Sequence, residues 1–313
     1  MRVNIISRDN GWGLTKDVNV MSQLLKAHGH QVFFSPFDVR NGLARGKFDI
    51  NIHCELVGGR AFNAARVNIL IPNPEWFEVD WLRRLRRFAV VMAKTNHTER
   101  LFTGLAQQHN APNLRVAYTS FATPTRRLPD VKKRQHFVHV AGNSRFKNTE
   151  ILIETWRVNP QLPILHIRNA YADLSDLVNG VENIEYKFGR LPESEIVQLQ
   201  NSCYWHIQAS KSEGFGHVIW ESMSTGGIVL TTDGAPMNEI PNCLYVKPKG
   251  QTMRHHLGDL YDLQQESLLE KVNTAMTMSD AQLAKWSADS IAIHAANNAK
   301  FNELFIKEIN KHG

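Results

Sequence analysis

Short apolar runs alternate with segments of helical spacing along the chain. In the first part, the run Val3–Ile6 precedes Lys16–His28, in which Val20, Leu24 and Leu25 recur near helical spacing. Strands that alternate with helices form parallel sheets through right-handed crossovers. The pattern predicts strands at 3–6, 31–35, 48–53, 67–71 and 88–93, and helices at 16–28, 81–87 and 96–108.

Residues 121–135 interrupt this alternation with a proline-containing, strongly basic stretch that has no apolar period, so we place a domain boundary there. The alternation then restarts, and a last helical segment at 280–311 is long enough to run back towards the first domain. We predict strands at 136–141, 163–167, 184–188, 204–209, 228–232 and 244–246, and helices at 149–158, 194–201, 217–224 and 265–277.

The expected fold class is α/β, with two Rossmann-like domains that face a central cleft. The N-terminal domain would span residues 1–130 and the C-terminal domain would span 131–285. Residues 286–313 would form a C-terminal helix that crosses back to the first domain.

Composition fits this picture. Hydrophobic residues make up 42% and charged residues 21% of the 313 residues, which is ordinary for a globular protein. No run approaches the roughly 18 apolar residues that span a bilayer, and the N-terminus turns polar too early for a signal peptide. Three widely separated cysteines suggest neither a disulfide framework nor a zinc site, so we expect a reducing, cytoplasmic compartment.

Charge is distributed unevenly along the chain. The net charge is +6, but residues 1–140 hold 21 basic and 10 acidic side chains, which predicts an anionic partner for the first half. Four arginines, Arg83, Arg84, Arg86 and Arg87, would point outward from a short helix whose apolar residues pack on the sheet. Such a stripe suits nucleic-acid phosphates or anionic lipid head groups, and an ordinary solvated face is the alternative.

The most informative segment follows the predicted strand 204–209 and opens the next helix. Gly214 and Gly216 allow backbone to approach a ligand closely, and the first amides of the helix offer an anion site. Glu213 precedes the turn and Glu221 lies two turns into the helix. Carboxylates accept hydrogen bonds from sugar and ribose hydroxyls. The alternative is that Glu213 only favours the helix dipole and Glu221 only faces solvent.

Glu213 and Glu221, with seven residues between them, resemble the signature of retaining GT-B glycosyltransferases, in particular the large family four. The likeness extends over roughly 136–245 and is weak in the first domain. It includes Val140-Ala141-Gly142 followed by Lys147, the loop Phe188-Gly189-Arg190-Leu191-Pro192, and the strand and turn from Gly226 to Ile240. The resemblance implies the fold, a sugar-nucleotide donor held by the domain at 131–285, an acceptor held by the domain at 1–130, and retention of configuration.

The resemblance also implies roles for single residues. Glu221 would bind the ribose hydroxyls, Glu213 would hold the donor sugar, and Lys147 would neutralise the departing diphosphate. Arg145 would replace the arginine that usually follows the glycine, where this chain has Asn143. Further donor-binding residues would be Gly142, Arg190, Leu191, Gly214, Phe215 and Gly216, with Gly11 and Gly13 from the first domain. The pattern assigns no role to His217.

On the acceptor side, His53 ends a predicted strand at the position where family members often carry a histidine that orients or deprotonates the acceptor. A purely structural histidine is the alternative, and Glu55 is the second choice for this role. Three residues near other strand ends would complete the acceptor side together with the four arginines: Glu75, Trp76 and Lys94.

We therefore expect a retaining glycosyltransferase with a UDP-sugar as co-substrate and no cofactor, metal or stable protein partner. Its acceptor would be a saccharide or lipid-linked saccharide, which would place the protein peripherally at the inner face of a membrane. One alternative is a transferase that glycosylates a hydroxymethylated base in DNA. Another is an epimerase or a non-catalytic sugar-nucleotide-binding subunit, against which the intact Glu213, Glu221 and Lys147 argue.

Overall fold

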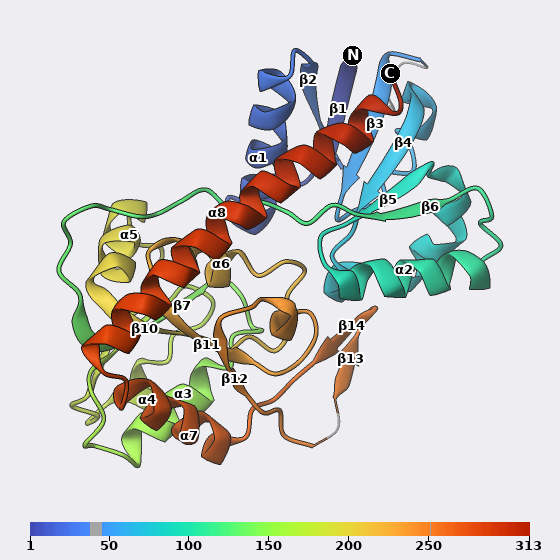
Figure 1. Cartoon of the computed structure of the whole chain (residues 1–313). Helices are drawn as coiled ribbons and strands as arrows, with labels where there is room; N and C mark the ends of the chain where they lie inside the picture. The colour runs from blue at the N-terminus through green and yellow to red at the C-terminus, as the bar shows by residue number, and fades with distance from the viewer. Residues whose placement is uncertain (38–45, 251) are drawn as a thin grey trace. The chain divides into compact units, whose positions relative to one another are not determined.

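The computed structural model describes residues 1–37, 46–250 and 252–313 (Figure 1). Within these residues the chain divides into two compact units. The first comprises Met1–Thr123, Arg254–Gly258 and Asn297–Gly313, and the second comprises Pro124–Met253 and Asp259–Ala296. The division after Thr123 falls inside the basic stretch at 121–135.

The first unit contains a parallel six-stranded sheet in the order β2-β1-β3-β4-β5-β6. The chain changes direction across the sheet between β1 and β3, so the crevice that binds ligands in such sheets lies at the carboxyl ends of these two strands. The strands are β1 (Arg2–Ser7), β2 (Gln31–Pro36), β3 (Phe48–Cys54), β4 (Ala65–Ile71), β5 (Val90–Ala93) and β6 (Arg115–Tyr118). The connections contain α1 (Gly13–Ala27), α2 (Asn96–Gln108) and the 3₁₀ segments η1 (Phe62–Ala64), η2 (Pro74–Trp76) and η3 (Val79–Arg87).

The second unit contains another parallel six-stranded sheet, in the order β12-β11-β10-β7-β8-β9. Here the change of direction falls between β7 and β10. The strands are β7 (Arg134–Gly142), β8 (Leu165–Asn169), β9 (Ile184–Phe188), β10 (Cys203–Gln208), β11 (Ile228–Thr232) and β12 (Cys243–Val246). Its helices are α3 (Thr149–Arg157), α4 (Ser175–Val178), α5 (Glu193–Ser202), α6 (His217–Ser224) and α7 (Gln265–Met276), with a 3₁₀ turn η4 (Met237–Glu239).

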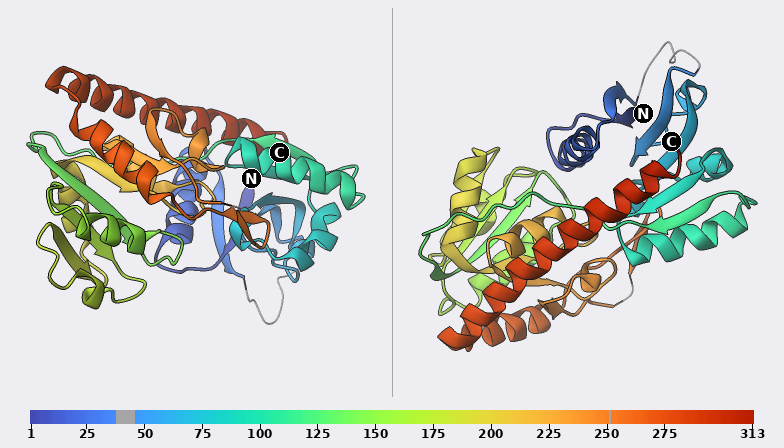
Figure 2. Two further views of the ribbon diagram at one scale, coloured as in Figure 1. Left: turned by 90° about the horizontal axis from the view of Figure 1, so that it is seen from below. Right: turned by 45° about the horizontal axis from the view of Figure 1, so that its top comes forward.

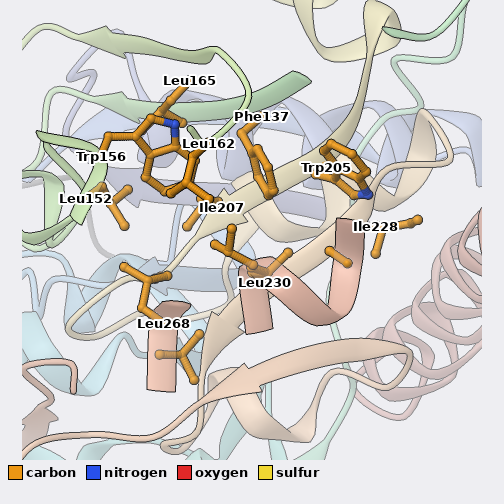
Figure 3. Packing of buried hydrophobic residues seen from close by; sticks show 14 of the residues in the cluster. Phe137, Leu152, Trp156, Leu162, Leu165, Trp205, Ile207, Ile228, Leu230 and Leu268 are labelled. Carbon is orange, nitrogen blue, oxygen red and sulfur yellow. The ribbon is translucent and has the colours of Figure 1, made fainter. Parts of the chain in front are cut away.

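The core of the second unit is formed by buried hydrophobic side chains from β7, β8, β10 and β11 together with the helices that cover them. Figure 3 shows Phe137 from β7 packed with Trp156 from α3 and Trp205 from β10. Their ring centroids lie 5.2 Å and 4.7 Å, respectively, from that of Phe137. Parallel strands are covered on both faces and therefore bury both sets of side chains. Each such side chain contributes about 1.5–3 kcal/mol by leaving water, so Trp205→Ala would remove a large part of the unit's stability.

The last helix, α8 (Asp280–Asn310), is one uninterrupted helix (Figure 2) that contributes to both units, since residues up to 296 belong to the second unit and those from 297 to the first. Asn297 accepts a hydrogen bond from Ser120 (2.6 Å) and donates one to the Phe121 carbonyl (2.8 Å). The return of the C-terminal helix to the first domain is thus confirmed, as is the α/β class with two parallel sheets.

Several local predictions need correction. The segment at 81–87 is a 3₁₀ helix, η3, that already begins at Val79, because its apolar residues recur every third position. The strand β6 was not predicted, since Arg115–Tyr118 is short and none of its residues is fully buried. A small hairpin of β13 (Met253–His255) and β14 (Gly258–Leu260) was also missed. Its tip belongs to the first unit, where Leu257 is buried in the apolar cluster that contains Leu85 and Phe102.

Candidate functional site

In the second unit, two loops meet at the point where the strand order reverses. One follows β7 and leads into α3, and the other follows β10 and leads into α6. The Lys211 amide donates to the Phe146 carbonyl at 2.8 Å, and the Asn148 side chain donates to the Ala209 carbonyl at 2.9 Å. These bonds hold the loops against each other at the carboxyl edge of the sheet, where open α/β sheets bind ligands.

Lys147 and Glu213, one from each loop, form an ion pair, and both side chains are about seven-eighths buried. Ser210 connects them, because its hydroxyl donates to Glu213 Oε1 at 2.6 Å and accepts from Lys147 Nζ at 3.1 Å. The structure thus brings together the two residues for which the resemblance implies a place at the donor sugar and diphosphate. The cluster contains one cation, one carboxylate and one hydroxyl, all within reach of a single polar ligand.

Two helix N-termini adjoin this cluster. Helix α6 is preceded by Gly216 at φ 85°, and α3 is preceded by Asn148 at φ 51°; neither cap residue makes a side-chain capping hydrogen bond. Amides at a helix N-terminus favour an anion. A side chain at residue 216 would be strained in the left-handed region, and its Cβ would lie 3.2 Å from Ile219 Cδ1. The left-handed backbone conformation at residue 216 therefore favours the glycine found there.

Aromatic packing supports the turn before α6. The ring of Phe215 is stacked 5.8 Å from that of Trp220, and the ring of His217 meets it edge-on at 5.3 Å. Gly214 is buried beside them. His217, for which the sequence suggested no role, is thus the first residue of α6 and helps to pack Phe215.

Glu221 has a partner that sequence reasoning missed. Arg126 Nη1 lies 3.1 Å from Glu221 Oε2, and the two side chains are 8% and 5% exposed. The same guanidinium donates to Gln200 Oε1 at 2.8 Å and pairs with Glu193, so it joins α5 to α6. The sequence places only a domain boundary in the basic stretch at 121–135, and no local pattern distinguishes Arg126 from the neighbouring Arg127.

The remaining donor-side residues are spread along the carboxyl edge of the sheet. Gly142 ends β7 at φ 59°, and Arg145 is exposed with its guanidinium 4.9 Å from the centre of the Phe146 ring. Arg190 and Leu191 follow β9, two strands away from β7, which corresponds to roughly 10 Å. A ligand that contacts both loops would have to span roughly 10 Å.

In the first unit, the loop of Gly11 and Gly13 follows β1. Gly11, at φ 67°, donates its amide to Thr15 Oγ1 at 2.8 Å and to Asp9 Oδ1 at 3.3 Å. The hydrogen bonds from Thr15 and Gly11 lower the pKa of Asp9. This loop therefore carries an ionised carboxylate and uses the Gly11 amide internally, which makes it a poor partner for phosphates as it stands.

His53 is fully buried in β3, and both ring nitrogens are engaged. The Gly58 amide donates to Nδ1 at 3.1 Å, and Nε2 lies 3.3 Å from Asn68 Oδ1, so the ring carries its proton on Nε2. Burial lowers the pKa of His53 to about 4. Its ring stacks on Phe62 at 4.9 Å. This geometry favours the structural alternative that we set beside the acceptor-side role, because no proton-accepting position remains open.

Lys94 lies in a buried ion pair with Asp17 at 2.5 Å, with side chains 2% and 3% exposed. Its Nζ also donates to Asn73 Oδ1 at 3.0 Å, and the Asn73 amide donates to Glu55 Oε2 at 2.7 Å. Glu55 has φ 65°, a conformation that side chains rarely adopt, and burial raises the pKa of its carboxyl. Lys94 therefore stabilises the carboxyl edge of the sheet, and Glu55 is the partly exposed acid at that edge.

Glu75 and Trp76 form the end of η2. The Glu75 carbonyl accepts a hydrogen bond from His255 Nδ1 at 2.7 Å, and the Glu75 side chain is buried. Trp76 remains partly exposed, with its ring 5.3 Å from that of His255. Of these two predicted acceptor-side residues, only Trp76 has a side chain that reaches the surface.

The arginines of η3 are exposed or half-buried, as the stripe of charge predicted. Arg84 Nη1 donates to the Val57 carbonyl at 3.4 Å, and Arg87 Nη2 donates to Asn63 Oδ1 at 3.0 Å. Within the described residues, no group of three His, Cys, Asp or Glu side chains could hold a metal ion. Nor is any helix in that part of the chain long and apolar enough to cross a membrane.

No protein-family model and no curated protein matches the sequence. Solved structures do match. HepE from Anabaena, in complex with UDP and glucose, is 16% identical with a TM-score of 0.70, and 99% of this chain and 100% of that chain are covered. A glycosyltransferase from Rickettsia africae is 12% identical with a TM-score of 0.71, covering 99% and 97%.

OtsA, solved without ligand, is 11% identical with a TM-score of 0.68 over 98% of this chain and 99% of its own. In contrast, the chain spans only 57% of the matching chain of the GtfA/B complex. The two parallel six-stranded sheets and the full-length matches together show that the chain has the GT-B fold of these glycosyltransferases.

Proposed function

We propose that the chain is a retaining glycosyltransferase that transfers a sugar from a UDP-sugar to a hydroxyl of a saccharide or lipid-linked saccharide. The observation that carries the proposal is the Lys147–Ser210–Glu213 cluster, because it lies at the switch point of the second sheet beside the N-terminus of α6. The choice of UDP follows the structures of HepE, which contain UDP and UDP-glucose.

The cluster provides what departure of a diphosphate requires. Breaking the bond to the sugar leaves negative charge on the phosphate oxygens, and preorganised cations and amides stabilise that charge. Lys147 supplies a largely buried ammonium, Arg145 supplies an exposed guanidinium from the same loop, and α6 supplies its first amides. With this cationic set, we propose that the reaction proceeds without a metal ion.

The two glutamates divide the remaining tasks. Glu213 accepts hydrogen bonds from the sugar hydroxyls, and its pairing with Lys147 places the sugar next to the diphosphate. Glu221, held by Arg126, accepts from the ribose hydroxyls. The seven-residue spacing of the two glutamates, which retaining GT-B enzymes share, supports retention of configuration.

For the acceptor side we propose Glu55 in place of His53. Its carboxyl lies at the carboxyl edge of the first sheet, one oxygen is held by Asn73, and the side chain is not fully buried. A carboxyl with a raised pKa in this position can accept a hydrogen bond from an acceptor hydroxyl and take up its proton as the new bond forms.

The experiment is direct. Melting temperatures with UDP, UDP-glucose, UDP-galactose and UDP-N-acetylglucosamine identify the donor, since a ligand that binds only the folded state raises the melting temperature. NMR of the product formed with simple saccharide acceptors, or of the sugar released by hydrolysis, then gives the anomeric configuration. Stabilisation by a UDP-sugar and an initial product of retained configuration are expected. No stabilisation by any sugar nucleotide would contradict the proposal, and an inverted product would contradict retention.

A further inference from the structure

The 3₁₀ geometry of η3 sorts its side chains into three rows. A 3₁₀ helix has 3.0 residues per turn, so residues three apart lie directly above one another. One row contains Leu82 and Leu85, which are buried in the core of the first unit. The other two rows carry the basic side chains: Arg83 and Arg86 in one, Arg84 and Arg87 in the other. In the first turn, Val79 of the leucine row is exposed and Trp81 of the Arg84–Arg87 row is buried. The last two turns therefore bury the leucines and present two parallel rows of guanidinium groups.

Two of these guanidinium groups are held in place without being neutralised. Arg84 lies against the backbone of Gly59, whose Cβ would be only 2.7 Å from Arg84 Nη1. Arg87 lies over the Phe62 ring at 4.7 Å and donates to the Asn63 side chain. These partners are a carbonyl, an aromatic ring and an amide, none of which is charged. The contacts order the groups and leave their charge intact.

The other row has no such contacts. Arg83 and Arg86 are exposed, and no ion pair involves any of the four arginines within the described residues. One turn rises about 6 Å, so the groups of a row repel each other at close range. Asp80, in the first turn, is the one acidic residue of η3. The arrangement is unfavourable in isolation and becomes favourable when a surface with several negative charges approaches.

Apolar groups next to the arginines indicate the kind of surface. Val79, at the start of η3, is 58% exposed, and Trp76, three residues earlier, is 38% exposed. Lipid bilayers place anionic phosphates directly above an apolar layer, and tryptophan is enriched at that boundary. The phosphate surface of a nucleic-acid duplex has no apolar layer for such groups. We propose that η3 and Trp76 form a docking surface for an anionic lipid bilayer.

The expected strength of membrane binding follows from the number of arginines on this surface. One arginine near an anionic membrane strengthens binding about fivefold, so four give a preference of about 10³ for anionic over zwitterionic membranes at low salt. The preference falls as salt screens the charges over distances of about 8–10 Å. This inference does not depend on nucleotide chemistry, so its test is independent of the proposed transferase activity.

The test uses the full-length chain and co-sedimentation with vesicles of phosphatidylcholine alone or mixed with phosphatidylglycerol. Replacing Arg83 and Arg86 together by Gln is expected to weaken binding to the anionic vesicles about 25-fold. The matched control replaces Arg127 and Lys285 by Gln, which removes the same charge from exposed positions of the second unit and is expected to change binding less than about twofold. Melting curves verify that both variants fold.

Further measurements distinguish the contribution of the arginines from that of the exposed apolar side chains. Val79→Ser and Trp76→Ser are expected to weaken the binding that remains at high salt, because that part comes from apolar contact. Equal losses in the arginine pair and its control overturn the proposal, as does equal binding to both kinds of vesicle. Duplex DNA at the same ionic strength is the competitor: if it is bound and vesicles are not, the surface is a nucleic-acid site and the proposal fails.

Discussion

Replacing Arg126 by Ala tests whether this arginine stabilises the buried charge of Glu221 in the second unit. The substitution removes the guanidinium from a pair whose side chains are 8% and 5% exposed, and it leaves the Glu221 carboxylate buried without its cation. It also removes the hydrogen bond to Gln200. The contact with Glu193 carries little weight, because that glutamate is 66% exposed and its charge is screened by water.

Breaking a buried pair by deleting one partner destabilises a protein by about 3–5 kcal/mol, because an uncompensated charge remains inside. Melting temperatures of domains of about 150–250 residues change by roughly 2–4 °C per kcal/mol. The second unit falls in this size range, so we expect its melting temperature to fall by about 6–20 °C. Adding Glu221→Gln to the variant removes the stranded charge and is expected to restore about 1–3 kcal/mol.

The assay is thermal and urea unfolding of the wild type, Arg126→Ala, Glu221→Gln and the double variant, with Arg127→Ala as the exposed control. Titration with UDP and with 2′-deoxy-UDP follows in every variant that folds. If Arg126 holds Glu221 for the ribose, its loss reduces the preference for UDP over 2′-deoxy-UDP. The reasoning is refuted if the two single substitutions add without coupling in the double variant, or if Arg127→Ala destabilises the protein as much as Arg126→Ala.

Three further predictions concern the donor cluster, the turn before α6 and pH. Lys147→Ala is expected to lower kcat by about 10²–10³ and to change UDP affinity less, whereas Glu221→Ala chiefly weakens UDP binding; kinetics and calorimetry separate the two effects, and equal changes in both contradict this division. Gly216→Ala forces a side chain into φ 85° and is expected to cost about 1–2 kcal/mol and to weaken UDP binding, measured by melting with and without UDP. Burial depresses the pKa of His53 to about 4 from its ordinary 6.5, so the unfolded chain takes up this proton first as the pH falls. Stability is complete above pH 6.5 and drops towards pH 4 by up to about 1.4 kcal/mol per pH unit from this residue. His53→Asn, which preserves an acceptor for the Gly58 amide, should reduce that slope in urea titrations, and an unchanged slope would contradict the assignment.

The α/β class and the order of strands and helices could be predicted because hydrophobic period is a local property. Strand β11 begins with the uninterrupted apolar run Ile228–Leu230, β3 has an apolar residue at every second position, and α8 ends within one residue of its predicted end. The pairing of Lys147 with Glu213, 66 positions apart in the sequence, follows from the switch point of a parallel sheet once their loops are placed after β7 and β10.

What escaped prediction depends on partners distant in the sequence. The role of His53 depends on Asn68 and Gly58, which contact its two ring nitrogens. The residues next to His53 in the sequence do not predict these contacts. Arg126 acquires its role from α5 and α6, and Lys94 from Asp17, 77 positions away. Side chains of the same type at exposed positions look identical in the sequence, so only the fold separates an acceptor-side lysine from a buried counter-ion.

The first unit is assembled from three segments that lie far apart in the sequence, and this affects its folding during synthesis on the ribosome. That unit needs Leu257 from the β13–β14 hairpin for its core, and Asn297 and Asn298 for the backbone that follows β6. These residues are translated more than a hundred positions after Thr123. All six strands of the amino-terminal sheet are translated by Tyr118, but these contacts to its core and to the backbone after β6 form only when almost the entire polypeptide has been made. A fragment that stops at Thr123 is therefore expected to expose apolar surface and to aggregate.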